Sequence, residues 1–428
     1  MTARLTTCFR STGRGRDINI RHLRAFDAAA RLESLNQASE AVHMSQSSVV
    51  YAVKRVEQMF GTRLLQRGSS GSRVTPAGEL VGRRLSAFFT MFEAAVAAAL
   101  MQAQLSKGHE CARLTGALTW QHMLAVVGVA RLTQARLVAS ALGVSASAIL
   151  TRLRDTERLF GCVLFERRDN QIFLNPVGQV LAEGLSQAIR ELDYAMDDLA
   201  AYVETARPTI AIGCLGFARL VLIPLAISKS PAKESSLVLR VIDDTFPVMA
   251  AKLRAGELDY LICTRKAGVD TRGLEGENLF QTRFAVACRR SHPLATARRV
   301  SVEDLSRFEW ILPLPQTPLR LACEEVFKDT GLPNGISVET RSAPLSFAML
   351  RSSDRLMIVS EHEMQAGGDG TDFVALPFSL PIPPREVVIY RREAFFAPPH
   401  HAHFLDHLRA VAATLSLPGR SAFDASAA

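Results

Sequence analysis

The most restrictive feature of this sequence is a segment that recurs after a constant offset of 100 residues. The stretch "FGTRLLQRGSSGSRVTPAGE" at 60–79 returns as "FGCVLFERRDNQIFLNPVGQ" at 160–179. Identical residues occupy these paired positions: Ala30/Ala130, Ala41/Ala141, Ser45/Ser145, Ser47/Ser147, Glu57/Glu157, Phe60/Phe160, Gly61/Gly161, Leu64/Leu164, Arg67/Arg167, Pro76/Pro176 and Gly78/Gly178. A register kept without a gap from residue 30 to residue 78 predicts a tandem duplication of one small structural unit.

The first copy has the pattern of three short helices followed by a β-hairpin. Apolar residues recur at helical spacing in "NIRHLRAFDAAARL", and Ser34 and Ser45 are suited to cap a second and a third helix. The third helix carries one apolar stripe and ends at Gly61, and Pro76 suits the start of a further helix. The stripe consists of Val49, Val53, Val56 and Phe60. Such an arrangement is a winged helix-turn-helix, whose third helix enters the major groove of DNA.

The outer face of that third helix is polar, and the positive charge of the chain gathers around it. Residues 1–100 hold 14 Lys and Arg against 7 Asp and Glu, whereas residues 101–206 hold 10 against 11. Polar and basic side chains of these kinds bind base edges and phosphates. We therefore predict DNA contacts from Asn36, Ser45, Gln46, Ser47, Ser48, Tyr51, Lys54, Arg55, Arg67 and Arg73. The alternative is an ordinary solvated helix face.

The second copy keeps the apolar core and changes the outer face. Ala146, Ala148 and Thr151 stand where the first copy has Gln46, Ser48 and Tyr51. Arg152, Arg154 and Arg168 remain available for phosphates, so this copy is expected to position the protein on DNA rather than to distinguish bases. A purely structural role for the second copy is the open alternative.

The first copy resembles the winged-helix domain of LysR-type transcriptional regulators. The resemblance rests on "IRHLRAF", "SLNQASEAVHMSQSSVVYAVKRVEQMFGTRLLQR" and "VTPAGE". Departures from the family pattern fall on the outer face, where Ser47, Val50 and Tyr51 replace the family's proline, serine and arginine. The resemblance implies a bacterial DNA-binding regulator with a small-molecule effector, whose long linker helices pair antiparallel between two chains.

Each copy is followed by a long helix with an apolar stripe, and such stripes need a partner helix. The stripes are Leu85, Phe89, Phe92, Val96 and Leu100 in one helix, and Leu185, Ile189, Leu192, Met196, Leu199 and Val203 in the other. Only a short connection, 106–120, joins the first helix to the second copy, and short connections favour antiparallel neighbours. We therefore expect the two helices to pair within one chain, with packing against another element as the alternative.

From Arg207-Pro208 onward, short apolar runs alternate with helical stretches, which predicts parallel sheets with helices between the strands. Strands are expected at "TIAIGCL", "LVLRVID" and "LDYLICT" in one lobe and at "FAVACRR", "EWILPLP", "ISVETRS" and "LMIVSE" in a second. "FVALPFS" and "REVVIYRRE" are expected to return to the first lobe. Together with "LRAGELDYLICT" and "SVEDLSRFEWILP", this pattern resembles the two-lobed, periplasmic-binding-protein-like effector domain of the same regulators.

Ligands of open α/β sheets bind beyond the carboxyl ends of the strands. These ends predict an effector site for a small polar or anionic molecule at Cys214, Gly216, Phe217, Thr264, Thr317 and Ser342. Cys214 and Cys263 also suggest a thiol switch, although buried cysteines are commoner. The "SPAK" motif at 230–233 and the pair His403 and His407 are isolated, so we expect no enzyme, no cofactor and no metal.

The expected architecture is multidomain: two helical winged units with linker helices, then a two-lobed α/β domain. The boundaries are a basic flexible tail 1–17, winged unit 18–76, linker helix 77–105, connector 106–116, winged unit 117–176, linker helix 177–206, effector domain 207–418 with crossovers near 277–281 and 373–378, and tail 419–428. No secretory signal and no uncharged run of about 18 apolar residues is present, and the odd number of cysteines does not suggest disulfides. We expect a cytoplasmic protein.

The expected partners are double-stranded DNA, an effector, further copies of the chain through its linker helices and effector domains, and RNA polymerase as a candidate, with no membrane. Two other functions stay open. One is a solute-binding sensor whose DNA-binding units have degenerated, and the other is an enzyme built on the two-lobed domain. Sequence-specific, salt-dependent DNA binding separates the regulator from both.

Overall fold

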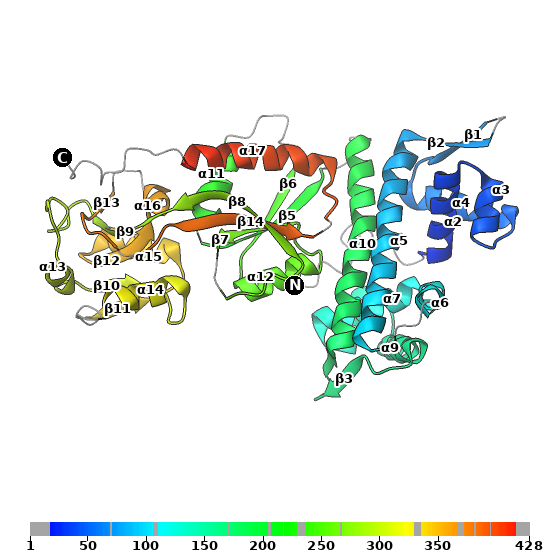
Figure 1. Ribbon diagram of the computed structural model, residues 1–428, viewed down its shortest axis with the longest axis horizontal. Coiled ribbons are helices and arrows are strands. Elements are labelled where there is room, and N and C mark those ends of the chain that lie inside the picture. The colour runs from blue at the N-terminus through cyan, green and yellow to red at the C-terminus, as the bar shows by residue number, and fades with distance from the viewer. Residues whose placement is uncertain are drawn as a thin grey trace. The chain divides into compact units, whose positions relative to one another are not determined.

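The computed structural model describes residues 18–68, 71–105, 110–169, 171–203, 207–216, 218–228, 237–265, 268–328, 335–366, 372–380, 382–393 and 395–416. The chain forms two compact parts. The N-terminal part comprises Met1–Thr209 with Arg254–Glu257, and the C-terminal part comprises Ile210–Leu253 with Leu258–Ala428. The expected tails 1–17 and 419–428 lie outside the described residues. Figure 1 shows the course of the chain and the element labels.

The first winged unit contains three helices and a two-stranded antiparallel wing, as the sequence predicts. Ser34 and Ser45 cap α3 and α4, Gly61 ends α4 with φ of 74°, and Pro76 opens α5. The whole α4 stripe that the sequence predicted is buried. The elements are α2 (Ile20–Leu32), α3 (Leu35–Ala41), α4 (Gln46–Phe60), β1 (Leu65–Gly68) and β2 (Gly71–Val74).

The second winged unit has the same elements in the same order. They are α7 (Trp120–Leu132), α8 (Ala135–Leu142), α9 (Ala146–Phe160), β3 (Phe165–Arg168) and β4 (Gln171–Leu174). In both units one glutamate supports the wing: Glu57 and Glu157 each accept hydrogen bonds from two successive backbone N–H groups at 2.9 and 3.1 Å. The bonded amides are those of Leu64 and Leu65 in the first unit and Leu164 and Phe165 in the second.

The repeated glycines mark a second contact that the two units share. A Cβ at Gly78 would collide with the carbonyl oxygen of Leu64, and a Cβ at Gly178 would collide with that of Leu164. Glycine therefore allows the long helix to begin directly against the entry to the wing. The repeated glutamate and the repeated glycine thus have the same structural role in both units.

The two long helices pair antiparallel within one chain, as the sequence predicts. They are α5 (Pro76–Gln102) and α10 (Pro176–Tyr202), and they lie side by side in Figure 1. Arg84, near the start of α5, contacts Asp198 near the end of α10, whereas Gly184 near the start of α10 approaches Ala95. The predicted α10 stripe is wrong at its end, because Val203 follows the helix and is 51% exposed.

The connector between the two copies is not an irregular loop. Residues 110–117 form helix α6 (Glu110–Ala117), which packs on α5 and α9. The sequence analysis missed this helix, whereas residues 106–109 of the expected connector lie outside the described residues. The connection therefore folds back along α5, in keeping with antiparallel neighbours.

Helix α5 is long and apolar enough to cross a membrane by length and composition alone. Its apolar residues instead form one core with α10 and the winged units, and Phe88 and Phe92 are fully buried in it. This burial is what a core helix requires, and it accounts for the composition of α5.

The C-terminal part contains two five-stranded sheets. The first has the order β6-β5-β7-β14-β8 and the second has the order β11-β10-β12-β9-β13. Strands β5 and β7 are parallel, as are β10, β11 and β12, whereas β14 and β9 run antiparallel to their neighbours. The first sheet comprises β5 (Thr209–Cys214), β6 (Val238–Ile242), β7 (Tyr260–Thr264), β8 (Leu274–Thr282) and β14 (Arg385–Arg392). The second comprises β9 (Phe284–Arg289), β10 (Trp310–Leu312), β11 (Ile336–Glu339), β12 (Leu356–Ser360) and β13 (Phe373–Ala375).

Helices cover both sheets of the C-terminal part. They are η2 (Ala218–Leu222), α11 (Ile223–Ser228), α12 (Phe246–Arg254), α13 (Val302–Ser306), α14 (Pro318–Val326), α15 (Ala343–Ser352), α16 (Glu361–Ala366) and α17 (Pro399–Ser416). Apolar side chains on the two faces of each sheet form separate cores against these helices.

The structure corrects three expectations for the C-terminal part. Strand β8 spans 274–282 and pairs with β14, so the first crossover comes at Arg283 rather than within 277–281. Strand β13 pairs with β9 and stays in the second sheet, so "FVALPFS" does not return to the first lobe. The second crossover therefore follows β13, and β14 alone makes the return. The β8–β14 pairing joins distant segments, which a local pattern does not reveal.

Candidate nucleic-acid interface and effector cleft

The predicted base-reading residues lie at the exposed start of α4. Gln46, Tyr51 and Lys54 are exposed, and Tyr51 is 58% exposed. Its ring packs edge-on against the His22 ring, with 5.7 Å between the centroids. Arg55 is also exposed and donates to Gln58 at 3.1 Å. Burial and then the neighbouring Arg55 charge lower the pKa of His22, which favours its neutral form.

The three serines of this segment are partly occupied by local structure. The Ser45 hydroxyl accepts from the Ser48 backbone N–H at 3.2 Å, as a helix cap does. The same hydroxyl is hydrogen-bonded to the hydroxyls of Ser47 and Ser48 at 3.0 and 2.7 Å. These residues therefore hold the start of the helix, and a contact with DNA would use only their remaining hydrogen-bonding capacity.

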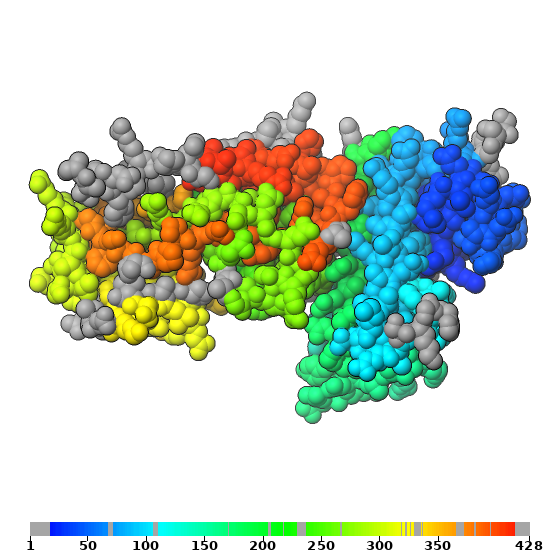
Figure 2. All heavy atoms as spheres, in the orientation of Figure 1, coloured from blue at the N-terminus to red at the C-terminus, as the bar shows by residue number. Residues whose placement is uncertain are grey.

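The other predicted contacts of the first unit flank α4. Asn36 is exposed on α3 and Arg73 is exposed on β2 of the wing. Arg67 pairs with Ser72 across the wing, but its side chain lies outside the described part of the chain. Both winged units present outer surfaces to solvent, blue for the first and cyan to green for the second (Figure 2).

The second unit presents fewer groups that could distinguish bases. Arg154 is exposed on α9, whereas Arg152 is half-buried close to His122. Arg168 lies on β3 and forms an ion pair with Glu166 at 2.5 Å, which offsets part of its charge. Burial first and then Arg152 lower the pKa of His122, whose ring accepts the capping bond of α7. This surface suits phosphate contact better than base recognition.

The predicted effector residues lie at the ends of strands and the starts of helices. Cys214 and Thr264 occupy the carboxyl ends of the paired parallel strands β5 and β7. Gly216 follows β5 with φ of 51°, a conformation that favours glycine. Phe217 lies outside the described residues. The first lobe thus brings three of the predicted residues to one edge of its sheet.

Thr317 and Ser342 have a structural task that the sequence analysis did not foresee. The Thr317 hydroxyl accepts from the backbone N–H of Arg320 at 3.4 Å and donates to the Leu314 carbonyl at 2.9 Å. The Ser342 hydroxyl accepts from the backbone N–H of Leu345 at 3.4 Å. Both residues are helix caps, of α14 and α15, so a ligand would meet the starts of these helices rather than free hydroxyls.

The suggested thiol switch is not supported by the geometry. Cys214 belongs to the apolar core on one face of the first sheet, and Cys263 belongs to the core on the opposite face. Burial raises the pKa of Cys214 to about 11, which disfavours the reactive thiolate. In the pairing of β5 with β7, Cys214 lies opposite Ile262, the residue before Cys263. Because successive side chains of a strand point to opposite faces, the two thiols lie on opposite sides of the sheet.

The other isolated motifs also have local explanations or lie outside the description. His407 is hydrogen-bonded to the carbonyl oxygen of Ala226 at 3.0 Å. No group of three metal-binding side chains occurs among the residues that the structure describes. The "SPAK" motif at 230–233 falls outside them.

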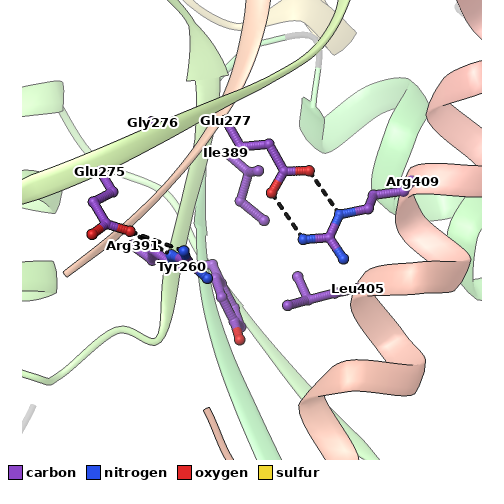
Figure 3. Close-up of a pocket in the computed structure, with 8 residues that line it drawn as sticks. All are labelled: Tyr260, Glu275, Gly276, Glu277, Ile389, Arg391, Leu405 and Arg409. Atoms are coloured by element: carbon purple, nitrogen blue, oxygen red, sulfur yellow. Dashed lines mark hydrogen bonds and ion pairs between the residues drawn. The ribbon is translucent and has the colours of Figure 1, made fainter. Parts of the chain in front are cut away.

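A pocket of about 110 Å³ is lined by residues of β7, β8, β14 and α17, and none of the predicted effector residues lines it. Figure 3 shows its charged groups pairing with each other across β8, β14 and α17. Arg409 donates to both carboxylate oxygens of Glu277 at 2.7 and 2.8 Å, and Arg391 donates to Glu275 at 2.9 Å. Hydrogen bonding from Arg409 lowers the pKa of Glu277. These mutually satisfied charges stabilise the sheet edge rather than form a ligand site.

A larger cleft of about 520 Å³ lies between the two winged units of the N-terminal part. The starts of α2 and α7 both border it, at Asn19 and Thr119, which cap these helices. The equivalent starts of the two winged units, which are 100 residues apart in the chain, therefore both border this cleft.

The sequence analysis missed one buried charged cluster. Arg84 forms ion pairs with Glu191 and Asp198 across the two long helices, at 3.0 and 2.8 Å. The signal was present, because an arginine and two acids interrupt helices whose paired faces are otherwise apolar. Only the three-dimensional pairing shows that these charges meet.

Two family models match more than half of the chain. The family described as "LysR substrate binding domain" matches residues 204–413. The family described as "Bacterial regulatory helix-turn-helix protein, lysR family" matches twice, at 20–79 and 120–179. The chain belongs to the LysR-type transcriptional regulators. As a member of this family it is a DNA-binding regulator of transcription.

Individual relatives agree with this assignment. The chain is similar to the HTH-type transcriptional regulator GalR of Pseudomonas putida, with 25% identity over 394 residues that cover 92% of this chain and 97% of GalR. It is also 25% identical to the regulator PcaQ of Agrobacterium fabrum, over 57% of this chain and 79% of PcaQ. GalR thus matches nearly the full length of this LysR-type chain, including the region of its second winged unit.

Solved structures support the fold. ArgP from Mycobacterium tuberculosis has a TM-score of 0.52 at 17% identity and covers 69% of this chain and 97% of its own. A full-length OxyR variant from Pseudomonas aeruginosa has a TM-score of 0.50 at 21% identity and covers 68% of this chain and 95% of its own. The LysR-type fold, with a helix-turn-helix domain and a two-lobed substrate-binding domain, is therefore the fold of this chain.

Proposed function

We propose that one chain of this LysR-type regulator binds an asymmetric DNA site through two unequal winged units. The observation that carries the proposal is the contrast between two matching scaffolds. Helix α4 presents Gln46 and Tyr51 where α9 presents Ala146 and Thr151, whereas each wing is supported by an equivalent glutamate, Glu57 or Glu157. We propose that the two units arose by duplication, and that the first reads bases while the second mainly contacts phosphates.

The proposed contacts follow from the chemistry of each side chain. Gln46 can bond an adenine through two hydrogen bonds, and Lys54 and Arg55 can bind guanine or phosphate. Asn36, Ser45, Ser47, Ser48, Tyr51, Arg67 and Arg73 complete the proposed set for the first unit. In the second unit the proposed phosphate contacts are Arg152, Arg154 and Arg168.

We further propose that a small polar or anionic effector binds between the two lobes of the C-terminal part, which is periplasmic-binding-protein-like. The proposed residues are Cys214, Gly216, Phe217, Thr264, Thr317 and Ser342. The helix starts at Thr317 and Ser342, which cap α14 and α15, support this placement, because helix N-termini favour anions. The effector would act by binding one arrangement of the assembly more tightly than another.

The remaining partners are also proposals. We propose further association of chains through the effector domains, a cytoplasmic location and RNA polymerase as a candidate partner. No catalytic step is part of the function that we propose.

The deciding experiment is selection of bound DNA from a random pool with the full-length protein and a matched pair of variants. Tyr51→Ala and Thr151→Ala remove side chains from equivalent, exposed positions of the two scaffolds. The parent protein should select a site with one defined half and one degenerate half. Tyr51→Ala should blur the defined half, whereas Thr151→Ala should leave the selected sequence unchanged.

The control for overall folding is the salt dependence of binding to one fixed site. Neither variant changes a basic residue, so the slope of affinity against salt should be the same for both. A perfectly palindromic selected site, or equal effects of the two variants, would contradict the proposal. A ligand-bound structure in which the ligand lies outside the space between the two lobes of the C-terminal part would contradict the effector placement.

A further inference from the structure

The α5–α10 seam, meaning the facing sides of these two long helices, differs at its two ends. At one end Arg84 is 1% exposed and donates to Asp198 at 2.8 Å and to Glu191 at 3.0 Å. The guanidinium also lies over the ring of Tyr194, 5.1 Å from its centroid. A second arginine, Arg190, stacks on the same ring at 4.4 Å. This end of the seam is thus a buried charged cluster with cations and carboxylates together.

The other end of the seam has uncharged residues at the positions equivalent to the cluster. The residues equivalent to Arg84, Glu191, Tyr194 and Asp198 under the offset of 100 are Gly184, Met91, Ala94 and Ala98. Gly184 approaches Ala95 so closely that an added Cβ would collide with the alanine side chain. The two helices come from equivalent repeats, yet they have become complementary rather than alike.

This difference determines in which pairs of helices the buried charged side chains have partners of opposite charge. If α5 paired with α5 of a second copy in the same register, Arg84 would face Met91 and Ala98 at both ends. If α10 paired with its own copy, Glu191 and Asp198 would be buried opposite Gly184 at both ends. Removing the partner of a buried charge is strongly unfavourable. Of these pairs, only α5 with α10 supplies Arg84, Glu191 and Asp198 with their partners.

The connection between the repeats favours an α10 from the same chain. Helix α6 packs on α5, with the Cys111 thiol 3.5 Å from the Glu93 carbonyl oxygen. Arg113 of α6 donates to the carbonyl oxygen of Leu159 at the end of α9. Residues 110–117 of the connection are therefore held against α5 and against the end of α9 in the second winged unit.

We propose that the Arg84–Glu191–Asp198 cluster selects the helix that pairs with α5, so that α5 accepts α10 of its own chain and excludes α5 of a second copy. One chain then carries a complete pair of winged units that does not exchange with other chains. This inference does not depend on which bases the first unit contacts.

The test uses a reporter at the middle of the seam in the full-length protein. The contacts of Arg84 and Gly184 place the midpoint near Thr90, which is exposed on α5. In a pair of two α5 helices, both copies of Thr90 would meet there. Thr90→Cys is therefore treated with a short bismaleimide, and cross-linked dimers are compared with those of the parent chain, which carries the same native cysteines.

The second arm of the test replaces the charged cluster by the residues found at the equivalent positions of the other end of the seam. The combined variant Arg84→Gly, Glu191→Met and Asp198→Ala gives the three positions of the cluster the residues found at the other end, Gly184, Met91 and Ala98, and it also carries Thr90→Cys. We expect no cross-linked dimer above the parent level with the cluster intact. Without the cluster the yield should rise at least about fivefold at high protein concentration, because a lost preference of even one kilocalorie per mole has that effect.

Two outcomes would overturn the proposal. A dimer yield above the parent level in Thr90→Cys with the cluster intact would show that α5 already pairs between chains. An equally low yield in the combined variant, with its helix content retained by circular dichroism, would show that the connection alone excludes the second copy. Should the combined variant fail to fold, the first arm still decides whether α5 helices meet.

Discussion

Replacing Arg84 by alanine should destabilise the N-terminal part alone. The change leaves the carboxylates of Glu191 and Asp198 buried, with side chains 2% and 5% exposed, without the arginine that bonds both. Breaking a buried ion pair by removing one partner costs about 3–5 kcal/mol. For a part of this size, each kilocalorie per mole lowers the melting temperature by about 2–4 °C, so we expect a decrease of about 10 °C.

The two tryptophans of the chain make this effect measurable in each part separately. Trp120 is buried in α7 of the N-terminal part, and Trp310 is buried in β10 of the C-terminal part. Trp310→Phe leaves Trp120 as the fluorescent reporter, and Trp120→Phe leaves Trp310. In the Arg84→Ala background, the Trp120 transition should shift to lower urea or temperature while the Trp310 transition stays in place.

A neighbouring arginine provides the matched control. Arg83 is exposed on the same helix, so Arg83→Ala should change stability by less than about 0.5 kcal/mol. Replacing all three charged residues by apolar ones should recover most of the loss, because the remaining carboxylates are removed as well. A Trp120 transition that shifts no further in Arg84→Ala than in Arg83→Ala would refute the argument.

Three further predictions follow from single sites. Gln46→Ala should relax discrimination at one base position by about 1–3 kcal/mol, and unchanged discrimination in competition binding would reject Gln46 as a base contact. Glu57→Ala and Glu157→Ala should each cost about 2 kcal/mol in urea unfolding followed by Trp120 fluorescence, because each leaves two wing amides unpaired; a cost in only one unit would contradict their equivalence. Because burial raises the pKa of Cys214 to about 11, this thiol is protonated at lower pH, so iodoacetamide should spare it at pH 8 and modify it only as the pH nears that value; mass spectrometry showing ready labelling at pH 8 would disprove this.

Much of the candidate DNA interface could be predicted because its signals are local. A serine three residues before a backbone amide, or an apolar side chain every third or fourth position, specifies a cap or a helix face within one or two turns. Ser34, Ser45, Gly61 and Pro76 therefore mark helix ends that the structure confirms. The same reasoning failed for Thr317 and Ser342, whose hydroxyls are also caps, because strand ends and helix starts lie next to each other in the chain.

By itself, the sequence determined the repeat, the two winged units, the stripes of their long helices and the alternation of strands and helices that follows. These features depend on residues close together in the chain, or on two copies of one pattern. Only the tertiary structure decided which distant segments meet: β8 with β14, β13 with β9, and Arg84 with Glu191 and Asp198. Such contacts join surfaces whose fit depends on packing and desolvation in three dimensions, and a charge in a helix pattern does not reveal whether its partner is water or a buried carboxylate.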